Sequence, residues 1–500
     1  MESSCKSGIQ CSGFRQRARL WTLNFGLWAL LLGGCAVGPN YRRPPVIEPV
    51  AFRGETRVAT NSLAELPWWQ VFHDDALQNL IRVALTNNYD VRIAVTRVEQ
   101  ARAIAAETRA QLFPQLNYTG LVGNTKNIGS SGTPLVNGVS GTSGISGTSG
   151  SGNSSGSSAT FSLADANASW EIDLFGRIRR LTESARAQFF ATEEAQRDVT
   201  AALIAQVAQD YFQLLALDRE LAIAKSTTNS YGQSLNIFNE RLRGGVASRL
   251  ETASAIALLS STAATIPDLE RLIVLQENQL SVLLGQSPQA IPRDGSRLEN
   301  QAPPDVPAGL PSALLERRPD IREAEQLLRS ANAQVGVATA NFFPQLTLTG
   351  LFGRVSPGLS VFTAGGATAW SGIANLTGPI FQGGRLRAQY RQAIAAREQS
   401  AVQYQATVLY ALQEVSNALV AREKFAEARV QQTRAVEAYR EAARISIERY
   451  RLGQSSYYEV LQEQQLLFPA ENALAQTQFN QLVTIIQLYR ALGGGWQTGR

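Results

Sequence analysis

Polar and apolar residues alternate without exception along the segment ADANASWEIDL, from Ala164 to Leu174. The even positions are apolar and the odd positions are polar, so a β-strand would place the two sets on opposite faces. An edge strand of a soluble sandwich would show this pattern. A strand of a membrane barrel, with lipid on one face and water on the other, would show it too.

The same arrangement occurs twice in the chain. FPQLNYTG (113–120) and FPQLTLTG (343–350) are nearly identical, and each proline lies 24 residues after an aspartate, Asp90 or Asp320. The intervening residues are rich in Ala, Arg, Gln and Glu, which favour helix, and proline ends a helix. Each copy therefore predicts a helix, a proline break and a strand, as expected of a duplicated half-protein.

Four strands are predicted per chain, at about 115–123, 161–174, 345–354 and 368–381. The last carries Trp370, Gly372 and Ala374 on one face. Transmembrane barrels begin at about eight strands, and an open sheet edge is not tolerated in lipid. A barrel built from this chain would therefore have to be shared between copies.

Two very long helices are predicted after the second strand of each copy. They run over 177–243 and 385–452, contain no proline and follow the glycine-marked corners FGRIRR and FQGGRLR. A helix of this length reaches roughly 100 Å. Apolar residues at Val408, Leu412, Val415 and Leu419 have the 3–4 spacing of coiled-coil packing. Each long helix ends at a glycine, and returning helices are expected at about 247–284 and 456–492.

The two tips of these hairpins also match. In ERLRGGVASRLETASA (240–255) and ERYRLGQSSYYEVLQEQQ (448–465), a glutamate follows the glycine by six residues, at Glu251 and Glu459. Both carboxylates are predicted to lie one to two turns into the returning helix. A solvated helix face is the simpler interpretation of each.

The N-terminus has the pattern of a lipoprotein signal. Arg15, Arg17 and Arg19 precede a short apolar run that ends in Leu-Gly-Gly-Cys at Cys35. The run is too short to span a bilayer and fits a signal-peptide core. Cys35 is therefore predicted to be lipidated. The Ala36 that follows favours sorting to the outer membrane.

Composition excludes several function classes. Of 500 residues, 17% are charged and 44% hydrophobic, and the net charge of +5 falls to about +2 without the leader. No Lys/Arg cluster follows the leader, so a nucleic-acid partner is not expected. No GxxxxGK[ST] sequence is present, so the chain cannot hydrolyse ATP through a P-loop. A serine triad would depend on the single histidine, His73.

The chain resembles the outer-membrane efflux ducts of the TolC/OprM type. The features that carry this resemblance are the repeat, the strand pairs, the long helices and the motifs PWWQVFHDDALQNL, YRLGQSSYYEVLQ and LYRALGGGW. The lipoprotein motif points to their lipoprotein (NodT-like) branch. The resemblance implies a mainly α-helical fold with a β-barrel part, in which three chains supply a 12-stranded barrel and a periplasmic helical tunnel. It implies no cofactor and no catalysis. The partners it implies are a homotrimer, a periplasmic adaptor and an inner-membrane pump driven by protons.

This resemblance divides the chain into a signal peptide (1–34) and a lipidated linker (35–67), followed by two helix–strand–strand–helix repeats (68–300, with a Gly/Ser-rich loop at 124–160, and 301–500). It also implies a periplasmic gate at Glu251, Tyr450, Glu459 and Gln462. Some relatives carry aspartate in place of Gln462. The implied adaptor-docking residues are Gly244, Gly245, Val246, Ala247, Ser248, Leu452, Gly453, Gln454, Ser455 and Ser456. Three Glu459 carboxylates converging on an axis would repel one another and attract cations.

The resulting hypothesis is a passive outer-membrane exit channel of a tripartite efflux system, lipid-anchored and extending into the periplasm. A duct for peptide or protein secretion, a coiled-coil tether between the membranes and an envelope enzyme are the alternatives. The exported substrate is not encoded in any pattern found.

Overall fold

The computed structural model describes residues 36–46, 49, 52–53, 74–126, 158–293, 295–301, 314–356 and 367–495. Cys35, His73, the signal peptide and most of the Gly/Ser-rich loop lie outside these described residues. The predictions made for them therefore stay predictions.

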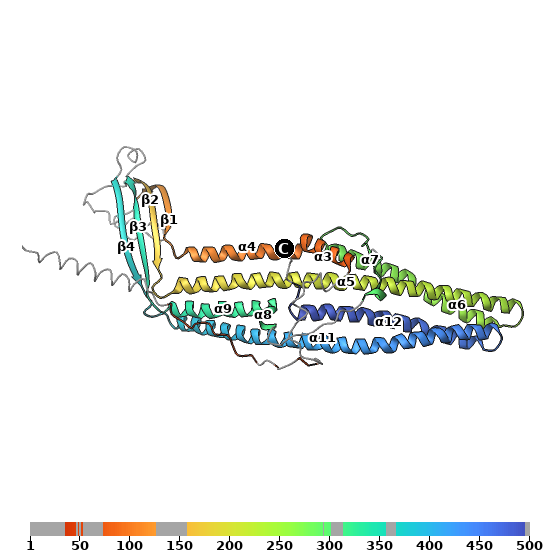
Figure 1. Cartoon of the computed structure of the whole chain (residues 1–500). Coiled ribbons are helices and arrows are strands. Elements are labelled where there is room, and N and C mark those ends of the chain that lie inside the picture. Colours follow the sequence, from red (N-terminus) through yellow and green to blue (C-terminus); the bar gives the residue numbers. More distant parts are fainter. Residues whose placement is uncertain are drawn as a thin grey trace, which may run out of the picture. The chain divides into compact units, whose positions relative to one another are not determined.

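The same order of elements occurs twice along the chain (Figure 1). The first series comprises α3 (Asp75–Asn87), α4 (Tyr89–Ala110), β1 (Gln115–Lys126), β2 (Ser158–Ile172), α5 (Arg177–Arg243), α6 (Arg249–Ala263) and α7 (Thr265–Leu283). A short 3₁₀ turn, η2 (Leu298–Asn300), follows. The second series comprises α8 (Leu314–Arg317), α9 (Pro319–Ala340), β3 (Gln345–Ser356), β4 (Ala367–Thr377), α11 (Arg385–Arg451) and α12 (Tyr457–Ala491).

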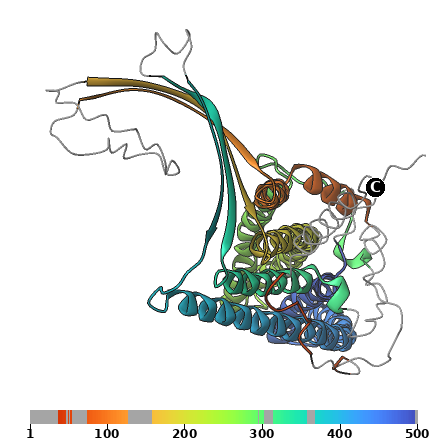
Figure 2. The same ribbon diagram turned by 90° about the vertical axis from the view of Figure 1, so that its left-hand side faces the viewer.

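The four strands form one antiparallel sheet in the order β1-β2-β3-β4. Figure 2 shows the strands curving together in the same sense. The register places Ala166, Phe352 and Trp370 in one row across the sheet, and Trp170 opposite Leu348. The alternation read from the sequence therefore becomes one mostly apolar face, which also carries Arg354.

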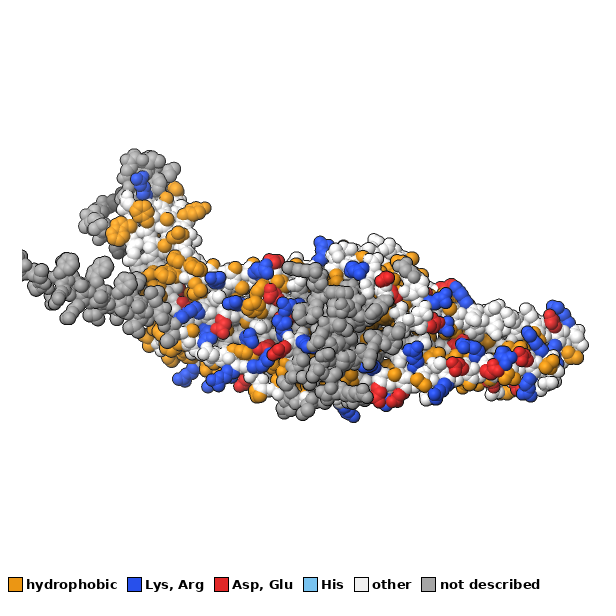
Figure 3. Space-filling model, in the orientation of Figure 1, with side chains coloured by type: hydrophobic (Ala, Val, Ile, Leu, Met, Phe, Trp, Pro, Cys, Tyr) orange, Lys and Arg blue, Asp and Glu red, His pale blue; other side chains and the backbone are white. Residues whose placement is uncertain are grey.

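This apolar face is uncovered in the single chain. The exposed fractions are 66% for Phe352 and 79% for Trp370. In the space-filling view, hydrophobic side chains gather on the sheet, whereas charged side chains are scattered over the helices (Figure 3). The opposite face carries the polar residues Asn167 and Asp165, and the Asn167 side-chain amide donates to the Thr119 hydroxyl at 3.3 Å.

The long helices match their predicted extents. Helix α5 covers 177–243, and α11 ends at Arg451, one residue before the expected end. Val408, Val415 and Leu419 of the predicted 3–4 stripe are buried, and Leu412 is half-buried. Residues that favour helix and the lack of proline account for the uninterrupted α5 and α11. Within the described residues, no helix combines the length and the apolar character needed to cross a bilayer.

Several predicted strand limits were wrong. Strand β1 ends at Lys126, rather than at 123, and β2 begins at Ser158, rather than at 161. Strands β2 and β4 end at Ile172 and Thr377, rather than at 174 and 381. After Ile172 the chain turns tightly, with the Leu174 amide donating to the Ile172 carbonyl at 2.9 Å. After Thr377, Gly378 and Pro379 end the strand, since proline has no N–H for the ladder.

The first returning helix is also divided, into α6 and α7 at Ala264. Pro267 explains the division, because its ring displaces the carbonyl four residues earlier, that of Ala263. Helix α12 also contains a proline, Pro469, yet continues through it as one helix.

Contacts divide the chain into two compact units, each of which takes segments from both halves of the sequence. Of the described residues, 36–41, 103–186 and 330–397 form the unit that contains the sheet. Residues 42–102, 187–329 and 398–495 form the unit that contains both helical tips.

Candidate functional site

The tips of the two helical hairpins end in the same backbone motif. In the first tip, the Val246 amide donates to the Arg241 carbonyl at 3.0 Å and the Gly245 amide to Leu242 at 3.0 Å. In the second, Gln454 donates to Arg449 at 2.8 Å and Gly453 to Tyr450 at 3.0 Å.

These bonds define a Schellman C-cap, whose turn residue adopts a left-handed conformation that favours glycine. Gly245 has a φ of 74° and Gly453 a φ of 76°. The tip glycines are therefore required by the turn geometry itself.

The returning helices begin with serine caps. The Glu251 carboxylate accepts from the Ser248 amide at 3.2 Å, completing a capping box at the start of α6. The Ser456 hydroxyl accepts from the Glu459 amide at 3.4 Å. Both glutamates thus lie in the first helical turn, slightly earlier than predicted, where the helix dipole favours a negative charge.

Tyr450 breaks the symmetry of the two tips. Its hydroxyl donates to the Glu251 carboxylate at 2.8 Å, across 199 residues of sequence. In the first tip, the matching position is Leu242, which has no hydroxyl to offer Glu459. A single tyrosine–carboxylate bond therefore joins α11 to α6.

Two residues that sequence reasoning missed hold Tyr450 in place. The Arg241 guanidinium lies 4.4 Å from the centre of the Tyr450 ring and donates to its backbone carbonyl at 2.6 Å. The Phe238 ring packs edge-on against the Tyr450 ring, with 5.0 Å between the two ring centres. Arg241 could have been found from the sequence, because it matches Arg449 in the paired ERLR and ERYR motifs.

A small apolar core lies beneath this contact. It contains buried residues from all four helices of the tips: Phe238, Ala255, Tyr450, Val460 and Leu461. The exposed fraction of Tyr450 is only 4%. Its hydroxyl is thus a buried polar group whose bond to Glu251 compensates for lost hydration.

Burial, together with the bond to Glu251, raises the pKa of Tyr450 to about 12. The pKa is raised above the ordinary value of 10, so the folded state favours the protonated phenol. The resulting stabilisation is complete below about pH 10 and is lost as the pH rises through about 12. The hydroxyl consequently remains a donor at any physiological pH.

Glu459 and Gln462 lie apart from this contact. Glu459 is exposed, and its carboxylate is 3.9 Å from the Arg449 guanidinium, which is itself about half-exposed. Gln462 is exposed on α12. Of the four predicted gate residues, the structure brings together Tyr450 and Glu251.

Comparison with known proteins decides the family. The model of the outer membrane efflux protein family matches residues 80–286 and 310–494. The chain belongs to this family.

Relatives cover the chain almost completely. The toluene efflux pump outer membrane protein TtgC of Pseudomonas putida is 36% identical over 496 residues, 96% of each chain. The cation efflux system protein CusC of Escherichia coli is 35% identical over 481 residues, 94% of this chain and 97% of its own. A solved structure of the open state of the Neisseria gonorrhoeae MtrE outer membrane channel superposes with a TM-score of 0.80 at 30% identity, covering 93% of this chain and 99% of that one.

These findings confirm the resemblance to outer-membrane efflux ducts, the mainly helical fold with strands and the outer-membrane location. The chain is an outer-membrane channel of an efflux system, and its relatives are channel proteins rather than enzymes. Among the described residues, no group of three or more His, Cys, Asp or Glu side chains is placed to hold a metal ion.

The predicted adaptor-docking residues of this efflux protein lie on the surface of both tips. Ala247 and Ser455 are half-buried and the other eight are exposed. The apolar side chains of Val246 and Leu452 have exposed fractions of 67% and 72%.

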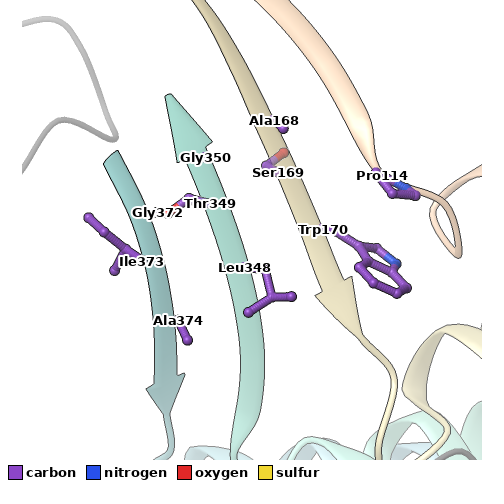
Figure 4. Close-up of a pocket in the computed structure, with 10 residues that line it drawn as sticks. All are labelled: Pro114, Ala168, Ser169, Trp170, Leu348, Thr349, Gly350, Gly372, Ile373 and Ala374. Carbon is purple, nitrogen blue, oxygen red and sulfur yellow. The ribbon is translucent and has the colours of Figure 1, made fainter. Parts of the chain in front are cut away.

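The sheet of the efflux protein carries a shallow, mostly apolar hollow of about 470 Å³ (Figure 4). Trp170 and Leu348 project into the same region, beside the small residues Gly350 and Gly372. The Trp170 indole N–H donates to the Leu112 carbonyl at 2.9 Å, which fixes the ring at the strand end near the helices. No charged side chain lines the hollow, so it offers no acid–base chemistry.

Proposed function

We propose that this channel protein works as a homotrimer, in which three four-stranded sheets join into one 12-stranded barrel. The observation that carries this proposal is the exposed apolar face of the sheet. In the described chain, β1 and β4 each pair on one side only. Lipid does not tolerate unpaired strand edges, so each outer edge must pair with a neighbouring copy.

The polar face of the sheet would then line a water-filled passage. A charged side chain that faces lipid would cost roughly 2–4 kcal/mol at the midplane of the membrane. This cost favours the placement of Asp165 on the face that lines the passage. Solutes would cross this passage by diffusion. The chain has no P-loop, so the energy for export would come from an inner-membrane partner. We propose that this partner is a pump driven by protons.

The Tyr450–Glu251 contact is proposed to act as the closing latch of the periplasmic end. It ties the second hairpin to the first through one hydrogen bond to a charged group. Such bonds contribute roughly 1.5–3 kcal/mol, enough to shift a closed–open equilibrium by an order of magnitude or more. The open-state structure of MtrE shows that one relative of similar fold does open.

Glu459 and Gln462 are proposed to line the same opening without belonging to the latch. Three copies of Glu459 about an axis would favour cations over anions. Opening would follow the docking of a periplasmic adaptor on the ten tip residues, of which Val246 and Leu452 offer the largest apolar side chains.

Sequence identity to the relatives does not identify the compound that this channel exports. TtgC is named for toluene and CusC for cations, at 36% and 35% identity. An organic compound and a metal ion are therefore both candidates, and duct activity towards peptides remains the alternative. The alternative of a coiled-coil tether would leave the apolar face of the sheet without a role. For the alternative of an envelope enzyme, a hydrolase screen of the purified protein is expected to be negative.

Reconstitution tests the proposed function. The purified protein is expected to migrate as a heat-dissociable trimer and to form conducting pores in planar lipid bilayers. A deletion strain should become more susceptible to the exported compounds, and a panel of organic solvents, drugs and metal ions would identify the cargo. A detergent-free, water-soluble monomer would contradict the proposal.

A further inference from the structure

One charged side chain lies on the apolar face of the sheet, among the side chains that the structure describes there. It is Arg354 of β3, whose register neighbours on this face are Ala164 and Thr368. The Arg354 side chain is exposed. A charge that faces lipid is costly at the midplane of the membrane, whereas the cost nearly vanishes at the two borders. Arg354 is therefore expected at a border.

No carboxylate of the described strands shares this face with Arg354. Asp165 and Glu171 occupy odd positions of β2 and project from the opposite face. The Glu171 carboxylate is moreover paired with the Arg177 guanidinium at 2.6 Å. Strand β3 is an inner strand with β2 and β4 of the same chain beside it, so a neighbouring copy would join the sheet elsewhere. A counter-ion for Arg354 is therefore expected from the medium around the sheet.

The place of Arg354 along β3 fits the outer border of the membrane. A membrane-spanning strand takes roughly 9–11 residues. Arg354 is the tenth residue of β3, which begins at Gln345 shortly after helix α9. The helices of this channel extend into the periplasm, so the far end of β3 lies in the outer leaflet. From there the long aliphatic stem of an arginine lets its guanidinium reach the lipid headgroups.

An apolar hollow lies on the same face, closer to the middle of β3. It is the hollow of about 470 Å³ shown in Figure 4. Gly350 and Gly372 pair directly across β3 and β4 in its lining, and a Cβ on Gly372 would meet nothing within 4 Å. Gly350 precedes Arg354 by four residues, or roughly 13 Å along the strand. A single lipid molecule can bridge this distance.

An aromatic pair occupies the row between the hollow and Arg354. Phe352 and Trp370 are register partners on β3 and β4, and both side chains are exposed. Small, aromatic and cationic residues thus follow one another along this face towards the outer leaflet. The sequence of rows matches the acyl chains and the charged headgroup of a lipid in the same order.

We propose that Arg354 and the hollow at Gly350 and Gly372 form a binding site for the phosphorylated glycolipid of the outer leaflet, lipopolysaccharide. The planar donor fork of the guanidinium binds a phosphate of its lipid A part, and one acyl chain fills the hollow. The site rests on the proposed trimeric barrel, which would carry three such sites on its outer surface. A bound lipid would fix the height of the barrel in the membrane.

Native mass spectrometry of the full-length trimer, extracted in detergent and titrated with purified bisphosphorylated lipid A, tests the site. Arg354→Gln is expected to weaken binding about tenfold, because it removes a charge-assisted hydrogen bond. Arg434→Gln is the matched control and should bind as the wild type does. Arg434 is likewise an exposed arginine, but it belongs to the unit that lacks the sheet.

Lipid A without phosphates separates the two parts of the site. It is expected to bind the wild type about tenfold more weakly than the phosphorylated form does, and to bind Arg354→Gln and the wild type equally. Gly372→Leu, which fills the hollow, should weaken the binding of both forms alike. Ser371→Leu, on the next residue and the opposite face, is its control and should leave both affinities unchanged.

Three results would count against the site. Unchanged binding of phosphorylated lipid A to Arg354→Gln would overturn it, and unchanged binding to Gly372→Leu would remove the hollow from it. Equal affinity of the wild type for phosphatidylglycerol and lipid A would overturn the assignment to lipopolysaccharide. Heat-dissociable migration of the same wild-type sample tests the trimer separately, so a missing trimer would contradict the proposed function instead.

Discussion

The Tyr450 hydroxyl is the most informative single group at the tips. Tyr450→Phe keeps the ring in the apolar core and removes only the bond to Glu251, so closure should weaken without loss of the fold. We expect the open probability of reconstituted trimers to rise roughly tenfold. Tyr458→Phe, also in the second tip but with its ring exposed, serves as the control. Equal conductance of Tyr450→Phe and wild type would remove the latch from the mechanism.

Glu459 is expected to govern ion preference and basal ion leak, although it lies outside the Tyr450–Glu251 latch. Its carboxylate is exposed and 3.9 Å from Arg449, so the pair contributes little to stability. Glu459→Ala should lower the preference for cations and raise basal ion leak, as measured by reversal potentials and conductance in bilayers. Unaltered selectivity and conductance would show that the side chain does not face the passage.

At the scale of elements, the hairpin turns depend on their left-handed glycines. Gly453→Ala places a Cβ at a φ of 76°, which costs roughly 1–2 kcal/mol. We expect faster hydrogen exchange over residues 449–457, while Gly232→Ala within α5 leaves this segment unchanged. The tip would then open more readily, so an equally protected turn would contradict the role of Gly453.

The ends of the helices and strands show which boundaries could be predicted from the sequence. The ends of α5 were predicted correctly because proline and glycine act locally on the backbone. The division at Ala264 was missed although Pro267 lies in the middle of the predicted helix 247–284, where proline breaks or kinks a helix. Proline alone does not decide the outcome, because α12 continues through Pro469. The early ends of β2 and β4 were missed because alternation continues for two residues or more beyond the last ladder pair.

At the scale of the whole molecule, the exposed sheet face must be covered by lipid. Trp370→Arg puts a charge on the apolar face, at a cost of roughly 2–4 kcal/mol near the membrane centre. We expect a marked loss of heat-dissociable trimer in the outer membrane. Ser371→Arg, on the next residue and the opposite face, is the control and should assemble. Normal assembly of both variants would mean that Trp370 does not meet lipid.

Periodicity, composition and the repeated motifs determined the kind of each element, the duplication and the division of the strands into apolar and polar faces. These properties depend on residues close in sequence, where backbone geometry and solvent preference act locally. The family resemblance also predicted a gate and a docking surface at both tips.

Only the tertiary structure decided which side chains meet. Tyr450 reaches Glu251 rather than Glu459, and the Arg180 guanidinium donates to the Asn40 side chain from 140 residues away. Each contact depends on how helices remote in sequence pack together and on which carbonyls are left without a partner. A pattern within one segment cannot predict such a contact. A buried hydrogen bond stabilises the fold only when its donor and its acceptor, which lie on different segments, come together.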